Sequence, residues 1–565
     1  MQFFRRFPLA WYGVCAVFFS LIALLYIHLE QNVYYWDYVT YYDRAVRLNE
    51  LAAQSPVKPI FKIFSSIWKA DYNYLAAIIP SLFVNLTGFH RQFYILSILL
   101  FYFFPALILF NTLLKAIFPH TTEQETRLLC LIPLTSVAFI APTLRGFVDI
   151  GGLAFIELAI LLTLKTDFSE KQSARKALWL GALLWGAFLF RRWYAYTIVS
   201  LFLSLPVLNY ALFQKIYNKQ RLKTLLAHFA LAGLSAVALV LLFQFGLLRK
   251  ILQTDYATIY HGYQKPFSAS VVATLKATGA LILPFFVFGL VSLRQEKDRR
   301  IRLCVLFSAF NLFTSFFLFC RTQSPGIQHV IPFAFWSLII ALYGMLAAGR
   351  RMHSASLQTV YGTTLLGLSG LATYCALFTQ APYRVPVLNA LLPEQTNPLQ
   401  IENYPAYQNL TADLVRDYQP HGGIVVLSSS AVLNESMLNT LGDQKLHLIS
   451  ISQLDLRDQF DPSLLRARYL VVTTPVQTHL APSEQRVITL PAAEILSGTG
   501  IGHAYRKIGA SYRLSQGTTA FLYEQVAPIA QEDLNSLMDR FYAVYPDWKK
   551  SPAHYGVSSV KQDND

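Results

Sequence analysis

The 565-residue chain has little charge. Aspartate, glutamate, lysine and arginine make up only 14% of it, whereas a typical soluble protein carries about 25%. This scarcity, together with an apolar fraction of 54%, disfavours a large soluble enzyme and a disordered protein. The mean hydropathy of +0.39 is lower than that of a chain lying wholly in a membrane. The composition therefore predicts a polytopic membrane protein that also carries a soluble portion.

Cysteine is also scarce, and several common motifs are missing. The five cysteines lie inside apolar runs, at Cys15, Cys130, Cys304, Cys320 and Cys375. None forms a C-x-x-C pair, so neither a disulfide framework nor a cysteine-based metal or redox site is indicated. The chain has no phosphate-binding P-loop, no H-E-x-x-H motif and no internal repeat.

Positive charge is abundant, but its placement does not indicate a nucleic-acid partner. The net charge of +15 comes largely from basic residues in short segments between apolar runs, such as "RQEKDRR" at 294–300. This pattern is typical of the cytoplasmic loops of membrane proteins. A nucleic-acid footprint would instead be a basic stripe on a soluble domain.

The apolar runs predict eleven membrane spans. They lie near 7–28, 93–117, 128–143, 148–165, 177–191, 193–213, 225–248, 271–293, 303–320, 329–349 and 360–380. A further stretch at 74–88 either crosses or lies at the interface. The loops that eleven spans place in the cytoplasm are richer in lysine and arginine than the opposing loops, so we expect that it does not cross. The N-terminus is then cytoplasmic and the C-terminus periplasmic, in a bacterial inner membrane.

Two domains are expected. Residues 1–380 form an α-helical membrane domain, in which 29–92 is a long first periplasmic loop. Residues 381–565 form a periplasmic α/β domain. Its expected strands are 422–429, 445–451, 468–474, 503–513 and 519–525, and its expected helices are 430–441 and 532–544.

The first candidate site follows the first span, in "VYYWDYVTYYDRAVRLNE" at 33–50. In a helix, Asp37, Tyr41 and Arg44 share one face, and Asp43 is a second acid nearby. A carboxylate framed by aromatic rings just outside a membrane could act as a general base on a hydroxyl, while the rings stack on sugars. The alternative is an aromatic belt at the level of the lipid headgroups, with a solvated aspartate.

The second candidate is Asp149, in the short turn "TLRGFVDIGG" between two apolar runs. It could be a metal ligand, a second acid or a substrate contact. The alternative is an ion pair with Arg145 at i,i+4 spacing in a helix, worth a few tenths of a kcal/mol.

The third candidate is a set of basic residues expected at the outer face. Its members are Arg145, Arg191, Arg192, His261, Lys265, Arg321 and His329. Adjacent arginines at 191 and 192, between two spans with almost no loop, indicate an anionic partner such as a phosphate. The alternative is that these side chains extend to lipid headgroups.

The motif Trp36-Asp37-x-x-x-Tyr41, the long first loop, the many spans and the C-terminal domain together resemble the GT-C superfamily of integral-membrane glycosyltransferases. The resemblance implies a sugar donor on a polyprenyl-phosphate carrier, an acceptor glycan, lipid or protein, and Asp37 as general base for inverting transfer. It implies juxtamembrane helices over 40–89 and a counterpart of the second acidic residue at Asp149.

The resemblance also limits the assignment. In "QHVIP", Gln328 and His329 stand where the family more often has Arg-Tyr. Tyr38 follows Asp37, so the Asp-Glu pair of many protein O-mannosyltransferases is missing. Taken with the residue-based candidates above, the expected substrate contacts are Trp36, Tyr41, Asp43, Arg44, Arg145, Asp149, Arg191, Arg192, His261, Lys265, Arg321 and His329.

Two other functions stay open at this point. One is an oligosaccharyltransferase or ligase that uses a pyrophosphate-linked glycan with a divalent metal, for which Asp37 and Asp149 could supply ligands. The other is a transporter or flippase of lipid-linked glycans. Transporters usually have midplane charges and internal repeats, whereas mid-span charges are scarce in this chain and no repeat is visible. No other cofactor is expected.

Overall fold

The computed structural model describes residues 8–88, 90–214, 216–379, 381–443 and 446–550, and the chain divides into two compact units. The membrane unit comprises Met1–Leu29, Thr40–Tyr256 and Gln264–Pro398. The C-terminal unit comprises Glu30–Val39, Ala257–Tyr263 and Leu399–Asp565. Residues 381–398, expected in the C-terminal domain, therefore lie in the membrane unit, while two short segments from the expected membrane domain lie in the C-terminal unit.

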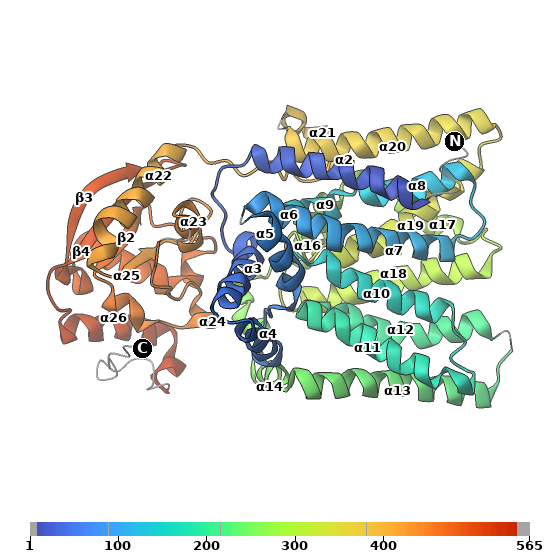
Figure 1. Ribbon diagram of the computed structural model, residues 1–565, viewed down its shortest axis with the longest axis horizontal. Coiled ribbons are helices and arrows are strands. Elements are labelled where there is room, and N and C mark those ends of the chain that lie inside the picture. Colours follow the sequence, from blue (N-terminus) through green and yellow to red (C-terminus); the bar gives the residue numbers. More distant parts are fainter. Residues whose placement is uncertain (1–7, 89, 215, 380, 444–445, 551–565) are drawn as a thin grey trace. The chain divides into compact units, whose positions relative to one another are not determined.

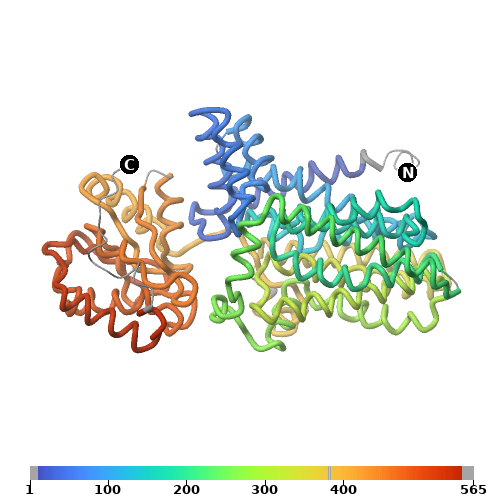
Figure 2. The backbone as a smooth tube through the Cα atoms, turned by 90° about the horizontal axis from the view of Figure 1, so that it is seen from below, coloured from blue at the N-terminus to red at the C-terminus, as the bar shows by residue number. Residues whose placement is uncertain are grey.

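The membrane unit is a bundle of helices (Figure 1). Its helices are α2 (Pro8–His28), α3 (Asp37–Gln54, shared with the C-terminal unit), α4 (Val57–Lys69), α5 (Ile78–Thr87), α6 (Arg91–Ile98), α7 (Phe104–Ile117), α8 (Glu123–Leu134), α9 (Val137–Leu144), α10 (Ile150–Leu164), α11 (Ala174–Phe190), α12 (Ala195–Phe213), α13 (Lys219–Phe243), α14 (Phe245–Gln253), α16 (Phe267–Thr278), α17 (Leu283–Ser292), α18 (Arg299–Cys320), α19 (Ile331–Arg350), α20 (Ala355–Phe378) and the short α21 (Pro386–Leu391). The long helices run alongside one another, whereas α4 runs across them at one end of the bundle (Figure 2).

The fold is that of a multi-pass membrane protein. Within the described ranges, eight helical segments are long and apolar enough to span a bilayer, or nine if α16 and the segment 280–292, bent by 89°, form one span. Each of the eleven expected runs is mainly helical, but α10 has 15 residues and α11 has 17, fewer than the roughly 20 that a span needs. The count of eleven therefore stays a prediction. The segment Leu75–Thr87 is a short apolar helix.

Small residues allow two helices of the bundle to approach closely. At Gly344 in α19, an added Cβ would lie 1.9 Å from the backbone oxygen of Phe285 in α17. At Gly289 in α17, it would lie 2.5 Å from the backbone oxygen of Ile340. Small residues have this role in many membrane helix interfaces, where close packing replaces the hydrophobic effect as the source of association.

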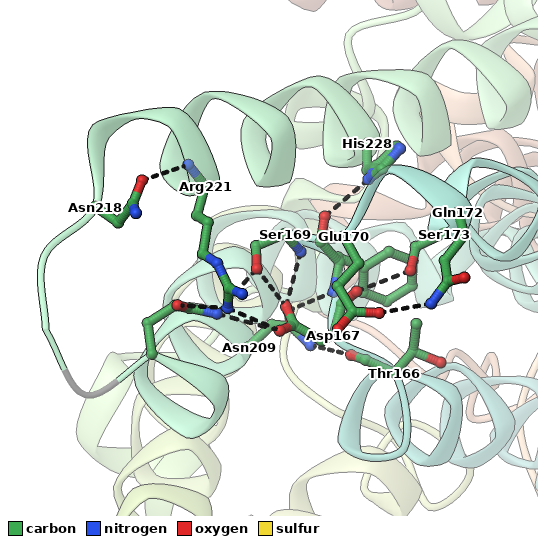
Figure 3. A network of polar contacts seen from close by, with 12 residues as sticks. Thr166, Asp167, Ser169, Glu170, Gln172, Ser173, Asn209, Asn218, Arg221 and His228 are labelled. Carbon is green, nitrogen blue, oxygen red and sulfur yellow. Dashed lines mark hydrogen bonds and ion pairs between the residues drawn. The ribbon is translucent and has the colours of Figure 1, made fainter.

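A polar network ties the loop between α10 and α11 to α12 and α13 (Figure 3). Asn209 in α12 donates to the backbone oxygen of Thr166 at 2.7 Å, and a ring nitrogen of His228 in α13 lies 2.7 Å from the backbone oxygen of Phe168. Asp167 accepts from the backbone N–H of Ser169 at 2.8 Å. These bonds satisfy loop backbone groups that the bundle buries.

The C-terminal unit is built on a four-stranded sheet in the order β1-β2-β4-β3. Its strands are β1 (Ile424–Leu427), β2 (Tyr469–Thr474), β3 (Tyr505–Arg513) and β4 (Thr519–Gln525). β1 and β2 are parallel, and β4 is antiparallel to both β2 and β3. Its main helices are α22 (Tyr404–Asp413), α23 (Glu435–Leu441), α25 (Arg486–Ser497) and α26 (Gln531–Val544).

Alternation along the strands produces two cores, one on each face of the sheet. Val425 and Leu427 of β1 pack into a core with residues of α25 and α26. Ile424 and Val426 pack into the other core, with residues of α22 and α23. Successive strand residues point to opposite faces, so a continuous apolar run is what a strand covered on both faces requires.

The expected α/β character of this unit is confirmed, with two corrections. The expected strand 445–451 is not a regular strand: among its described residues, Leu448 forms only an isolated bridge with Ile424. The partly buried side chains of Ile449 and Ile451 pack against a core, so their apolar character reflects burial and not strand pairing. The expected helix 430–441 begins only at Glu435, because Asn434 caps it by accepting from the backbone N–H of Met437.

Replacing Gly344 should reveal the close approach of α17 and α19. Gly344→Ala should lower the thermal unfolding midpoint of the detergent-solubilised protein by several degrees, since overpacking costs about 1–3 kcal/mol. Gly367→Ala in α20 is the control, because no atom lies within 4 Å of an added Cβ there. Equal midpoints for the two variants would contradict the packing described.

Candidate functional site

A buried ion pair joins the start of α10 to the end of α11. Asp149 is the residue before α10 and is completely buried, while Arg191 follows α11 with its side chain 4% exposed. The Nε of Arg191 donates to Oδ1 of Asp149 at 2.8 Å, and the indole N–H of Trp193 donates to the same oxygen at 2.7 Å. A buried charge requires a partner and hydrogen bonds, and this pair has both.

Tyrosines surround the Arg191 guanidinium. Its Nη1 donates to the hydroxyl of Tyr41 in α3 at 2.7 Å. The guanidinium carbon lies 5.1 Å from the ring centroid of Tyr41 and 4.8 Å from that of Tyr72. Arg44 lies 5.0–5.6 Å from the centroids of Tyr41, Tyr72 and Tyr74. Aromatic faces attract cations, so these rings hold two guanidinium groups close to the start of α3.

A second ion-paired group continues this cluster. Arg192 lies 3.0 Å from Oδ1 of Asp71 and over the ring of Tyr256. Lys250 of α14 and the Tyr256 hydroxyl also donate to Asp71. Burial by itself would raise the pKa of Asp71, but Arg192, Lys250 and Tyr256 together hold it below its usual value. Asp71 is therefore an ionised carboxylate shared by two cations.

His329 lies beside this cluster as a neutral donor. Its ring packs edge-on to Trp193, with centroids 5.3 Å apart, and its Nδ1 accepts from the backbone N–H of Gly326 at 3.1 Å. Burial lowers the pKa of His329 to about 3, with further lowering from Arg191 and Arg192. Because Nδ1 accepts, the neutral ring carries its proton on Nε2 and can donate it.

Asp43 is the carboxylate in this region whose pKa is moved towards neutrality. Burial raises the pKa of Asp43 to about 6, against the opposing charges of Arg91 and Arg44. A carboxyl group with such a pKa changes its charge close to physiological pH.

Asp37 and Trp36 belong to the C-terminal unit. Asp37 is the first residue of α3 and Tyr41 follows four residues later in the same helix. Trp36 has a positive φ of 47°, and its ring lies against that of His479, with centroids 4.6 Å apart. The role of Asp37 as a base stays a prediction.

The remaining predicted residues have other surroundings. The Nη2 of Arg145 donates to the backbone oxygen of Asn397 at 2.5 Å. Gly146, with a φ of 92°, follows the end of α9, so Arg145 and Asp149 do not lie in one continuous helix. An ion pair between the two stays a prediction. His261 lies 3.6 Å from Glu484 in the C-terminal unit. Three further predicted residues are not among the contacts described above: Lys265 and Arg321 are exposed, and Gln328 is buried.

Sequence reasoning missed Asp71, Lys250, Tyr256 and Trp193. The segment "DYNY" at 71–74 repeats the pattern that marked Asp37, a carboxylate framed by tyrosines in the first long loop, so a signal existed for Asp71. Nothing local marks Lys250, because its partner lies 179 residues away.

No candidate metal centre is found in the part of the chain that the structure describes, since no three His, Cys, Asp or Glu side chains are grouped to hold an ion. Asp37 and Asp149, which the metal-dependent alternative would use, lie in different units. That alternative stays untested.

Comparisons with known proteins identify solved structures only. No family model matches the chain, and no curated protein matches it. A crystal structure of ArnT from Cupriavidus metallidurans bound to undecaprenyl phosphate is 10% identical, with a TM-score of 0.49, over 92% of this chain and 98% of that one. The archaeal oligosaccharyltransferase AglB from Archaeoglobus fulgidus, in complex with an inhibitory peptide and a dolichol-phosphate, is 12% identical, with a TM-score of 0.45, over 93% and 75%. These likenesses concern the fold alone.

The low pKa of His329 predicts a loss of stability in acid. Below pH 6.5 the unfolded chain protonates this histidine while the folded chain does not, so acidification favours unfolding. Between pH 7 and pH 5 this group should cost about 2 kcal/mol. His329→Gln should make the thermal unfolding midpoint fall less over this range than it does in the wild type.

His353→Gln is the matched control, because His353 is exposed. It should leave the pH dependence of the midpoint unchanged. If wild type and His329→Gln lose stability in parallel on acidification, His329 is not held neutral by its surroundings.

Proposed function

We propose that the chain is a glycosyltransferase that moves a sugar from a polyprenyl-phosphate carrier to an acceptor hydroxyl at the periplasmic face of a bacterial inner membrane. The observation that carries the proposal is the cluster of arginines around the buried Asp149–Arg191 pair. The sequence resemblance in Trp36, Asp37 and Tyr41 supports the choice of reaction.

Two cations of the cluster share one carboxylate. Arg191 is matched by Asp149, but Asp71 is shared between Arg192 and Lys250. Within the described part of the chain, Nη1 of Arg44 is buried without a hydrogen-bond partner. A concentration of guanidinium groups, one of them with a buried nitrogen left unbonded, favours an anionic ligand.

Phosphate suits this cluster better than a lone carboxylate. A guanidinium donates two parallel N–H groups to phosphate oxygens, and aromatic faces hold its plane in position. The side chain of Arg192 is 18% exposed against 4% for Arg191. The proposal therefore assigns the phosphate contact to Arg192 and gives Arg191 the task of holding the cluster together.

The proposed reaction is a single displacement. The acceptor oxygen attacks the anomeric carbon, the bond between that carbon and the phosphate oxygen breaks, and Asp37 takes the hydroxyl proton. The configuration at the anomeric carbon is inverted. Arg192 stabilises the departing phosphate as negative charge develops on it, and a positioned base contributes about 10²–10⁴-fold to the rate.

Binding of the carrier tests the phosphate contact without knowledge of the sugar. Arg192→Gln should weaken the binding of undecaprenyl phosphate about 10–100-fold, since hydrogen bonds to a charged group are worth about 1.5–3 kcal/mol. Affinity can be measured with the purified protein in detergent or nanodiscs.

Arg47→Gln is the control, because Arg47 is half-exposed in α3 and pairs only with the neighbouring Glu50 in the contacts described. This variant should bind as the wild type does. Equal affinity for the wild type and Arg192→Gln would remove Arg192 from the phosphate site.

Removing the carboxylate tests the base. Asp37→Asn should lower the acceptor-dependent release of undecaprenyl phosphate, from a panel of undecaprenyl-phosphate hexoses and pentoses, by about 10²-fold or more. The thermal unfolding midpoint should not change. Asp539→Asn, on the exposed surface of α26, should retain full activity, and near-normal turnover by Asp37→Asn would refute the assignment.

A further inference from the structure

The segment that carries Asp37 is built into the C-terminal unit. The backbone N–H of Gln31 donates to the oxygen of Leu399 at 2.8 Å, and the side chain of Asn32 donates to the oxygen of Thr440 at 2.9 Å. Val33 is buried in the core beside α22 and α23. Residues 30–39 therefore follow the fold of a unit formed mainly by residues more than 350 positions later in the chain.

The residue before Asp37 is held in an unfavourable conformation. Trp36 has a φ of 47°, in the left-handed region that bulky side chains avoid. Such a conformation persists only where the surroundings impose it, and strain of this kind gathers at functional sites. The Trp36 ring packs against the ring of His479, with centroids 4.6 Å apart.

His479 is itself fixed on both sides. Its Nδ1 lies 3.0 Å from the backbone oxygen of Ser429, and its Nε2 lies 2.8 Å from the hydroxyl of Tyr263. A carbonyl only accepts, so Nδ1 carries the proton and Nε2 accepts from Tyr263. Burial lowers the pKa of His479. The hydrogen bond to Ser429 raises it and the charge of Arg457 lowers it, and the net pKa is below the usual value. The ring is therefore held in this neutral form.

The position of His479 follows from the sheet. Ser429 lies just beyond β1 and His479 just beyond β2, so the parallel strands bring them to the same edge. Gln485, which is completely buried, accepts from the backbone N–H groups of His479 and Leu480 at 2.9 and 2.8 Å. The loop that carries the imidazole is thereby fixed.

Tyr263 links this arrangement to Asp37. Burial raises the pKa of Tyr263 to about 12, and the charge of Asp37 contributes to the rise against the opposing charge of Arg457. The Asp37 carboxylate thus lies within electrostatic range of the hydroxyl that holds His479.

We propose that the C-terminal unit positions the catalytic aspartate, with His479 as the central positioning residue between Tyr263 and Trp36. The inference rests on the proposed function, in which Asp37 is the base. It gives the C-terminal unit a place in the catalytic apparatus: the Tyr263–His479–Trp36 arrangement fixes the backbone from which Asp37 projects. His479 acts through Trp36 and does not contact the substrate.

A double-mutant cycle on the full-length protein tests this. His479→Ala should lower kcat at least about tenfold, since a small displacement of a catalytic group is costly, and should leave KM for the undecaprenyl-phosphate sugar within about twofold. Tyr263→Phe, which removes one hydroxyl, should lower kcat less. The double variant should be no slower than His479→Ala, because both residues act through one interaction.

His503→Ala is the control, since His503 is an exposed histidine of the same unit that pairs with Asp533. It should keep wild-type kcat. If His479→Ala fails to fold, as judged by its thermal unfolding midpoint, Tyr263→Phe alone decides, and a wild-type kcat in that variant overturns the inference.

Other outcomes separate the inference from its premise. A folded His479→Ala with unchanged kcat, a rise in KM without a fall in kcat, or independent losses from the two changes would each overturn the positioning role. Near-normal turnover by Asp37→Asn would instead overturn the premise. Loss of activity in Asp37→Asn together with normal kcat in His479→Ala would leave the proposed function standing and remove only the inference.

Discussion

The membrane unit depends on one buried ion pair. Removing Asp149 would leave the Arg191 guanidinium buried without its charge partner, and removing Arg191 would do the same to Asp149, a loss that typically costs about 3–5 kcal/mol. The pair joins α10 to α11, and the rings of Tyr41, Tyr72 and Trp193 gather around it. Such pairs rarely add stability over apolar residues, so the consequence of this pair is mainly positional: Asp149 fixes the Arg191 guanidinium beside the rings of Tyr41 and Tyr72.

Much of the fold can be predicted from the sequence, because buried helices and strands appear in it as apolar runs. The spans around α18 and α19 and the strands β2 and β4 were predicted within a few residues. The segment 445–451 was not, because an apolar stretch that packs against a core looks the same as one that pairs in a sheet. Runs such as α10 are predicted as helices, but their shortness leaves the number of crossings open.

Many residues of the candidate site could be predicted from the sequence, but the partners that each of them contacts could not. Asp149 stood out as a carboxylate in a short turn between two apolar runs, and Arg191 as a cation between two spans joined by almost no loop. Asp149 pairs with Arg191, which lies 42 residues further along the chain. The contacts of Trp36 with His479, or of Asp71 with Lys250, join residues far apart in sequence, and no local pattern encodes such contacts.

The proposed reaction makes a new glycosidic bond with inversion at the anomeric carbon. The most direct measurement is the anomeric configuration of the product, determined by NMR after incubation with an undecaprenyl-phosphate sugar of defined configuration and an acceptor. We expect a covalent product whose anomeric configuration is opposite to that of the donor. A product of retained configuration, or movement of the lipid-linked sugar across vesicles without any covalent product, would contradict it.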